Sequence, residues 1–274
     1  MKSRKEYDRN APNKNLVWLL PLFIILLYLP IIFSSSMKVA EQKSDTAINV
    51  DSASAVKPEQ MTLADTIAEL YSSQLDSCRQ MIVVTNADKK NVKARLTAYE
   101  LVNGSWRPVV GLDFPANLGG AGFADVGTKR EGDRKTPSGI FSITHFFSKF
   151  ADFNAKLEKI PVTQNTVWVD DVKDSLYNRP FECTENETRK GENLLRPKDA
   201  LYDYVMVINY NVECAKGKGS AIFLHCWSGQ GRPTLGCVAV EKSYILKLFD
   251  WIDCSEHPVI VMGTREDDGI LKLK

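Results

Sequence analysis

One short window in the last fifth of the chain gathers the residue types that nucleophilic catalysis needs. An apolar run ends at His225, a loop rich in glycine and proline follows, and Gly236 and Cys237 then lead back into apolar sequence. A cysteine acts as a nucleophile when its thiol has a lowered pKa and a base stands nearby. The window therefore predicts acyl transfer with Cys237 as the nucleophile and His225 as the general base.

The same loop offers groups that can bind a substrate. Gly236 has no side chain, so the backbone can approach a substrate carbonyl closely, and the N–H groups of Gly236 and Cys237 can hold a developing oxyanion. We predict substrate-binding or oxyanion roles for Gly236 and for Trp227, Arg232 and Thr234. Trp227 is as well suited to pack against the domain as to stack on a substrate.

A purely structural cysteine and a zinc site are the two alternatives to catalysis, and both fit these residues less well. Most single cysteines are structural, but the histidine and the flanking pattern favour a catalytic role for Cys237. Cys214, Cys226, Cys237 and His225 are possible zinc ligands, yet the chain has no Cys-x-x-Cys pair, so we predict neither a metal nor a cofactor.

The composition narrows the class of protein. The chain has 274 residues, with 35 Lys+Arg against 34 Asp+Glu, and its net charge of +1 gives no general attraction to nucleic acid. Three histidines are too few for a His-rich metal site, and six cysteines are too few for a disulfide scaffold. The length suits one large domain or two small ones.

The N-terminal region predicts a membrane-associated protein. Residues 1–15 are basic, and Leu16–Phe33 runs eighteen residues without a charge, which at about 1.5 Å per residue nearly spans a bilayer core of ~30 Å. We interpret 16–34 as a transmembrane anchor, with a cleaved signal peptide as the alternative. The basic flank should stay in the cytoplasm and place the rest of the chain outside it. Residues 35–60 are polar and aperiodic, which is typical of a flexible tether.

Residues 61–274 are predicted to form one domain that is mainly β with a few helices. Apolar residues at helical spacing predict a helix from about 61 to Ser77 and another through 244–252. Asn103 and Gly104 predict a tight turn between two strands. Strands are expected at 81–85, 94–101, 106–110, 140–144, 167–169, 204–210, 221–226 and 259–262.

The window from His225 to Cys237 resembles the signature of a known family, the bacterial L,D-transpeptidase catalytic domain (YkuD-like), in which a histidine precedes a loop ending in Ser/Thr-x-Gly-Cys. The matching residues are His225, Thr234, Gly236 and Cys237. A second stretch, from Lys129 to Phe141, is similar to the family's segment G-D-x-x-T-P-x-G-x-F. The resemblance covers roughly residues 81–262 and implies a β-sandwich catalytic domain.

The resemblance also implies a substrate and a location. The substrate would be the stem peptide of peptidoglycan, and the acyl-enzyme would be resolved either by an amine, giving a cross-link, or by water, giving carboxypeptidase or amidase activity. The host would be a bacterium, with the protein single-pass in the inner membrane and its catalytic domain in the periplasm or at the cell exterior.

Two departures from the family pattern leave an alternative open. The family commonly has arginine two residues after the cysteine, where this chain has Ala239, and Cys226 replaces the usual glycine after the histidine. The form Pro-Thr-x-Gly-Cys-Val-Ala suggests a divergent branch in which Arg232 supplies a cation instead. The alternative is a catalytically inactive domain of the same fold that binds the cell wall.

The remaining motif residues have structural interpretations. Asp133 and Thr136 are expected to organise a turn and a strand rather than to catalyse. Outside the cytoplasm some cysteines should pair, and Cys183 and Cys214, which flank a polar insert, are the first pair that we expect.

Overall fold

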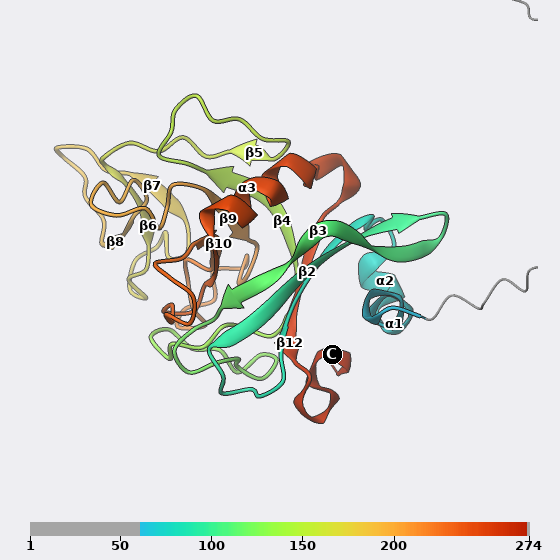
Figure 1. Cartoon of the computed structure of the whole chain (residues 1–274). Helices are drawn as coiled ribbons and strands as arrows, with labels where there is room; N and C mark the ends of the chain where they lie inside the picture. The colour runs from blue at the N-terminus through green and yellow to red at the C-terminus, as the bar shows by residue number, and fades with distance from the viewer. Residues whose placement is uncertain (1–60, 273–274) are drawn as a thin grey trace, which may run out of the picture. The chain divides into compact units, whose positions relative to one another are not determined.

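A computed structural model describes residues 61–272 and shows a mainly β domain with few helices (Figure 1). The predicted basic segment at 1–15, the anchor or signal peptide at 16–34 and the tether at 35–60 lie outside the described residues. Within residues 61–272, no helix is long and apolar enough to cross a membrane.

Most strands of the described chain belong to one sheet that closes on itself. Its hydrogen-bonded order is β12-β1-β2-β3-β11-β10-β9-β4-β5, and β12 also pairs with β4. The strands are β1 (Gln80–Asn86), β2 (Lys93–Val102), β3 (Ser105–Asn117), β4 (Gly139–Phe147), β5 (Glu158–Lys159), β9 (Val205–Ile208), β10 (Phe223–Cys226), β11 (Val238–Val240) and β12 (Val259–Thr264).

This closed sheet differs from the sandwich of two sheets that the resemblance implies. Strand β4 makes the closure because its first half, Gly139 to Ser142, pairs with β12, while the part from Ile143 onward pairs with β9. A register shift between Ile143 and His145 lets β4 change partners. The result is a continuous ring of strands around one core.

The hairpin between β2 and β3 forms as the sequence predicts. Asn103 and Gly104 both have positive φ, 50° and 81°, which is the backbone of a two-residue turn that matches the twist of the strands. Strand β3 is longer than expected and continues to Asn117, where it reaches the loop that precedes Cys237.

The two predicted helices are present, but the first is interrupted. Helix α1 (Leu63–Leu70) ends at Tyr71, whose φ of −122° is not helical, and a short helix α2 (Ser72–Leu75) follows. The prediction of one helix to Ser77 was therefore wrong, because the buried ring of Tyr71 fixes the chain against the sheet. Helix α3 (Lys242–Trp251) follows β11 directly.

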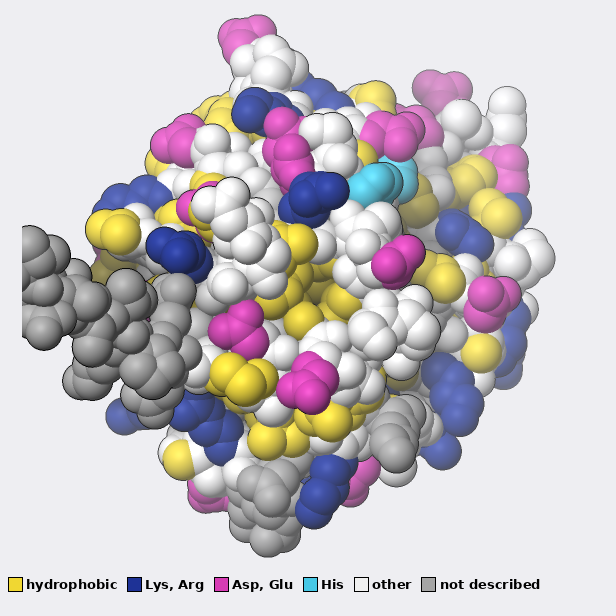
Figure 2. All heavy atoms as spheres, turned by 90° about the vertical axis from the view of Figure 1, so that its right-hand side faces the viewer, with side chains coloured by type: hydrophobic (Ala, Val, Ile, Leu, Met, Phe, Trp, Pro, Cys, Tyr) yellow, Lys and Arg dark blue, Asp and Glu magenta, His cyan; other side chains and the backbone are white. Residues whose placement is uncertain are grey.

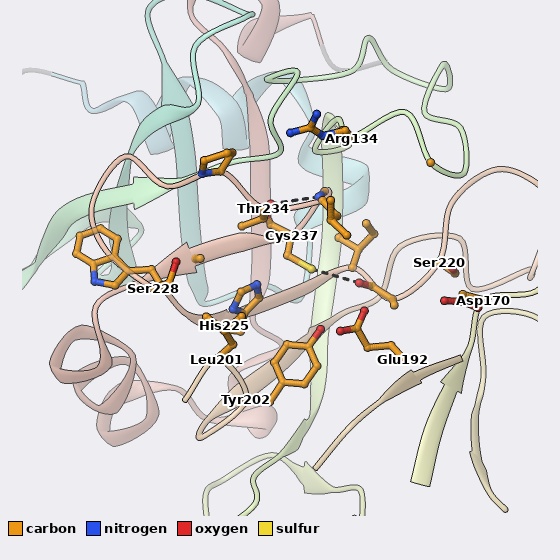
Figure 3. Close-up of a pocket in the computed structure, with 18 of the residues that line it drawn as sticks. Arg134, Asp170, Glu192, Leu201, Tyr202, Ser220, His225, Ser228, Thr234 and Cys237 are labelled. Carbon is orange, nitrogen blue, oxygen red and sulfur yellow. Dashed lines mark hydrogen bonds between the residues drawn. The ribbon is translucent and has the colours of Figure 1, made fainter. Parts of the chain in front are cut away.

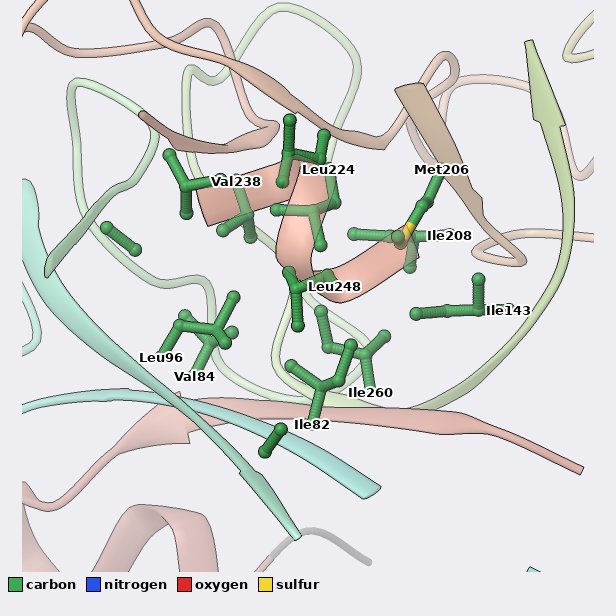
Figure 4. Close-up of a cluster of buried hydrophobic side chains, with 14 of the residues drawn as sticks. Ile82, Val84, Leu96, Ile143, Met206, Ile208, Leu224, Val238, Leu248 and Ile260 are labelled. Atoms are coloured by element: carbon green, nitrogen blue, oxygen red, sulfur yellow. The ribbon is translucent and has the colours of Figure 1, made fainter. Parts of the chain in front are cut away.

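Several strands are buried on both faces, which explains their uninterrupted apolar runs. The main core lies inside the ring and includes Ile82, Leu224, Ile260 and Leu248 of α3 (Figure 4). Helices α1 and α2 cover the outer face of β1 and β12. A third cluster covers the outer face of β9 and β10, and it contains Cys237.

That third cluster is completed by a small separate sheet. Strands β6 (Thr166–Val169), β7 (Pro180–Glu182) and β8 (Gly191–Asn193) pair in the order β7-β6-β8. Trp168 of β6 and Leu194 after β8 pack with Phe223 of β10. The predicted strand at 167–169 is thus confirmed, but it belongs to this small sheet, which forms one wall beside Cys237.

The expected disulfide between Cys183 and Cys214 is not formed, and all six cysteines are free thiols in the described chain. Cys183 lies just after β7, and its Sγ accepts a hydrogen bond from Arg189 N at 3.4 Å. Cys214 lies in a tight loop, with φ of 55°, and its Sγ faces Val212 O at 3.5 Å. Each thiol is thus held against the backbone of its own loop.

Candidate active site

The pairing of β10 with β11 brings the predicted base and nucleophile together. The two strands run parallel, with His225 opposite Ala239 and Leu224 opposite Val238. Ala239 lies opposite His225 and points to the same side of the sheet. Cys237, two residues before Ala239 and just before β11, therefore points to that side as well. Figure 3 shows the two side chains next to each other in one cleft.

The hydrogen bond of His225 fixes which nitrogen carries the proton. Nδ1 lies 2.8 Å from the carbonyl oxygen of Cys226, and because a carbonyl only accepts, Nδ1 must donate. Nε2 of the neutral ring therefore has a free lone pair. His225 is only 6% exposed, and Tyr202 packs edge-on against its ring with centroids 5.4 Å apart. The backbone and Tyr202 thus hold His225 in the tautomer that a base needs.

The thiol of Cys237 is buried and protonated in the resting protein. The residue is 8% exposed, and Sγ donates to Ala221 O at 3.3 Å. Burial raises the pKa of the thiol to about 12, and burial likewise lowers the pKa of His225 to about 4. The expectation of a lowered thiol pKa was therefore wrong for the substrate-free protein, in which thiol and imidazole are both neutral.

Threonines from the two sequence windows hold the backbone at Cys237. Thr234 Oγ1 donates to the carbonyl oxygen of Cys237 at 2.7 Å and accepts from Gly236 N at 3.1 Å. Thr136 Oγ1 contacts the same Cys237 oxygen at 3.4 Å and accepts from Gly119 N at 2.9 Å. Thr234 thus contacts the backbone around Cys237, and Thr136 is an organiser, as the sequence predicts.

Asp133 also organises a turn. Its carboxylate accepts hydrogen bonds from the backbone N–H groups of Arg130 and Lys135, at 2.7 and 2.8 Å, and from Lys129 Nζ at 2.7 Å. These donors lower the pKa of Asp133 against the opposing effect of its burial. The turn carries Lys129 to the wall of the cleft.

The two predicted oxyanion donors differ in their partners. The N–H of Gly236 is engaged by Thr234, whereas the N–H of Cys237 makes no hydrogen bond to any described residue. Gly236 has φ of 154°, and a Cβ there would lie 3.1 Å from Lys135 O. Glycine thus allows the tight backbone entry into Cys237, while the Cys237 N–H is the donor left for a substrate oxygen.

The other predicted substrate contacts lie around a cleft of about 570 Å³. Trp227 is half-buried and Arg232 is exposed, and both line the cleft together with Ala239. The buried side chain of Asn117 anchors their loop, since it donates to Gly229 O and accepts from Gly231 N, each at 2.8 Å.

Three further residues line the cleft and were missed by the sequence analysis: Glu192, Arg196 and Tyr202. Arg196 pairs with Glu192 and Asp199 at 2.6 Å each, and its guanidinium lies over the Tyr202 ring, 5.1 Å from the centroid. Burial raises the pKa of Tyr202, and the nearby carboxylate of Glu192 raises it further. These residues come from the polar insert, where no motif signals them.

The buried imidazole gives a prediction for stability against pH. His225 has a folded pKa of about 4 against an ordinary value of 6.5, so between these values the unfolded chain binds a proton that the folded protein does not. The free energy of unfolding should therefore fall by up to about 3 kcal/mol from this group as the pH falls from about 6.5 to about 4. Urea unfolding of the wild type and of His225→Gln, which stays neutral, measures it; equal acid sensitivity of the two proteins would contradict a neutral buried imidazole.

Comparison with known proteins identifies the family of the domain that contains this cleft. Residues 82–261 match the family model of the L,D-transpeptidase catalytic domain. The comparisons with curated proteins and with solved structures give no match. The matched segment is more than half of the chain and contains both Thr136 and Cys237. The chain therefore belongs to the L,D-transpeptidase catalytic domain family.

Proposed function

We propose that the protein is a cysteine acyltransferase acting on the stem peptides of peptidoglycan, with Cys237 as nucleophile and His225 as general base. The family supports L,D-transpeptidase chemistry in general. The observation that carries the residue assignment is the hydrogen bond from His225 Nδ1 to the Cys226 carbonyl, which leaves Nε2 unprotonated in the cleft that holds Cys237.

The neutral pair dictates how acylation proceeds. Sγ attacks the substrate carbonyl carbon while its proton moves to Nε2, because a separate thiolate is disfavoured where the thiol pKa is about 12. The carbonyl oxygen becomes negative and accepts from the Cys237 N–H. The imidazolium then gives its proton to the leaving amine as the C–N bond breaks, and a thioester remains. An amine or water attacks the thioester in a second step that restores the thiol.

Purified muropeptides test this proposal. The domain, residues 61–274, is incubated with a muropeptide donor, with and without an amine acceptor, and mass spectrometry identifies the products. Cross-linked or exchanged products support transpeptidation, and a shortened stem in the absence of acceptor supports hydrolysis. Unchanged muropeptides under all conditions would contradict acyl transfer.

A catalytically inactive domain that binds the cell wall is the second candidate. It is favoured by the buried thiol, which donates to Ala221 O rather than to His225, and by Ala239 in place of the usual arginine. This candidate predicts retention of the domain on purified peptidoglycan without any new product, and Cys237→Ala should then bind as well as the wild type.

We further propose that residues 16–34 anchor the protein in the inner membrane, with the catalytic domain on the outer side. On the face in Figure 2, acidic and basic side chains are interspersed, and we propose no nucleic-acid partner. Alkaline phosphatase fused after Lys274 is active only outside the cytoplasm, so the fusion should be active. An inactive fusion of full length would contradict this orientation.

A further inference from the structure

The cleft contains a buried cation that the proposed mechanism does not use. Lys129 is 3% exposed and lines the cleft beside Cys237. Its ammonium donates to Arg130 O and to Asp133 Oδ1, at 2.7 Å each. An ammonium has three N–H groups, so one is left without a partner among the described residues.

The stem of Lys129 packs directly against the backbone that enters the nucleophile. A Cβ at Gly219 would lie 3.2 Å from Lys129 Cγ, and a Cβ at Gly236 would lie 3.6 Å from Lys129 Cε. Two glycines thus border the space that the lysine fills. Since Gly236 immediately precedes Cys237, the ammonium, one bond beyond Cε, is fixed close to the reacting backbone.

The other cations of the cleft are less able to act on the thiol. Arg196 is held by two carboxylates, those of Glu192 and Asp199. Arg134 and Arg232 are exposed, where solvent weakens their fields. Lys129 has one carboxylate partner, Asp133, whose charge is shared with two backbone N–H groups.

The charges around Cys237 agree with this geometry. Burial and the carboxylate of Glu192 raise the pKa of the thiol, whereas Lys129 and Arg196 lower it. The remaining titratable groups at the thiol, Tyr202 and His225, are both neutral at pH 7 because burial raises the pKa of the first and lowers that of the second.

We propose that the ammonium of Lys129 stabilises the negative charge that develops on the substrate oxygen during acylation, and the charge on the Cys237 sulfur whenever the thiol ionises. It thereby compensates for the arginine that is absent at position 239. The acylation part of this inference rests on the proposed function, but the effect on the thiol does not. Lys129 acts through its charge on Cys237 and not as a proton carrier.

Alkylation of Cys237 measures this charge without any substrate. Well below the thiol pKa, the thiolate fraction changes tenfold per pH unit, so the rate of reaction with iodoacetamide at pH 8 reports a change in pKa. Lys129→Met keeps the stem and removes the charge, and we expect alkylation about tenfold slower. Lys129→Arg should restore most of the rate, and Arg134→Met, which removes an exposed cation of the same cleft, should change it little.

A second reagent separates charge from loosened packing. Iodoacetate is anionic and iodoacetamide is neutral, so loss of a nearby cation lowers the rate with iodoacetate relative to the rate with iodoacetamide. Wider access to the thiol instead raises the rates with both reagents. Asp133→Asn leaves Lys129 in place without its carboxylate partner and should speed alkylation by several-fold; it keeps the test decisive if Lys129→Met fails to fold.

The outcomes are distinguishable from those of the proposed function. Slower alkylation, a lower iodoacetate ratio and acyl-enzyme formation slowed about 10–100-fold in Lys129→Met would support the inference. Unchanged alkylation in Lys129→Met, or no acceleration in Asp133→Asn, would overturn it even if muropeptides are converted. If alkylation responds as expected but the wild type converts no muropeptide, the function fails and the effect on the thiol stands.

Discussion

Replacement of Cys237 by alanine should abolish conversion of muropeptides, because the scheme has no other nucleophile. Loss of the thiol removes the covalent path, so the residual rate should approach that of the buffer blank. The measurement is product formation by mass spectrometry at equal protein concentration. Turnover by Cys237→Ala at more than about one per cent of the wild-type rate would show that another group attacks the substrate.

The variant should remain folded. Cys237 packs against the cluster that contains Phe223 and Trp168, and removing one sulfur atom leaves only a small cavity. We expect a loss of about 1 kcal/mol in the free energy of unfolding. Circular dichroism and urea unfolding check this, so loss of activity cannot be attributed to loss of structure.

Replacement of His225 by glutamine should lower the rate of acylation by about 10²–10⁴-fold, the usual contribution of general-base catalysis. The effect should be large because a thiol with a pKa of about 12 ionises very little at pH 7 without a base. The reaction of His225→Gln should also become faster with rising pH, as hydroxide replaces the missing base. A rate within tenfold of the wild type would contradict this role.

Cys226→Ser is the matched control for both variants. Cys226 is adjacent to His225, but successive strand residues point to opposite faces, and its side chain lies in the main core with Leu224. A hydroxyl there should reduce stability and leave the rate per folded molecule nearly unchanged. If Cys226→Ser abolishes turnover and Cys237→Ala does not, the nucleophile has been misassigned.

The sequence predicts that His225 and Cys237 lie in one site, and the structure places both in the same cleft. The apolar run before His225 indicates a strand, whereas the short strand β11 after Cys237 was not expected from the sequence. The parallel register that places His225 opposite Ala239 follows from the fold and cannot be read from either segment. The turn at Asn103 and Gly104 was equally accessible, because only a few residue types adopt positive φ at low cost.

The electrostatics of the site were not predictable. Burial reverses the expected direction of the Cys237 pKa, and the residues packed with Cys237 include Trp168 of the small sheet and Leu194 and Tyr202 of the polar insert. Glu192 and Arg196 come from that insert and carry no motif. Lys129 stands within a recognised motif, but only its position beside Gly236 brings its charge close to Cys237.

The most direct test of the account is the mass of the protein after brief exposure to a muropeptide donor without acceptor. The account predicts a covalent adduct with the mass of the donor minus its leaving group, located on the peptide that contains Cys237. The adduct should be absent in Cys237→Ala and should disappear when an amine acceptor is added. An adduct on another residue, or conversion of the donor without any adduct on Cys237 on the millisecond-to-second scale, would contradict catalysis through this thioester.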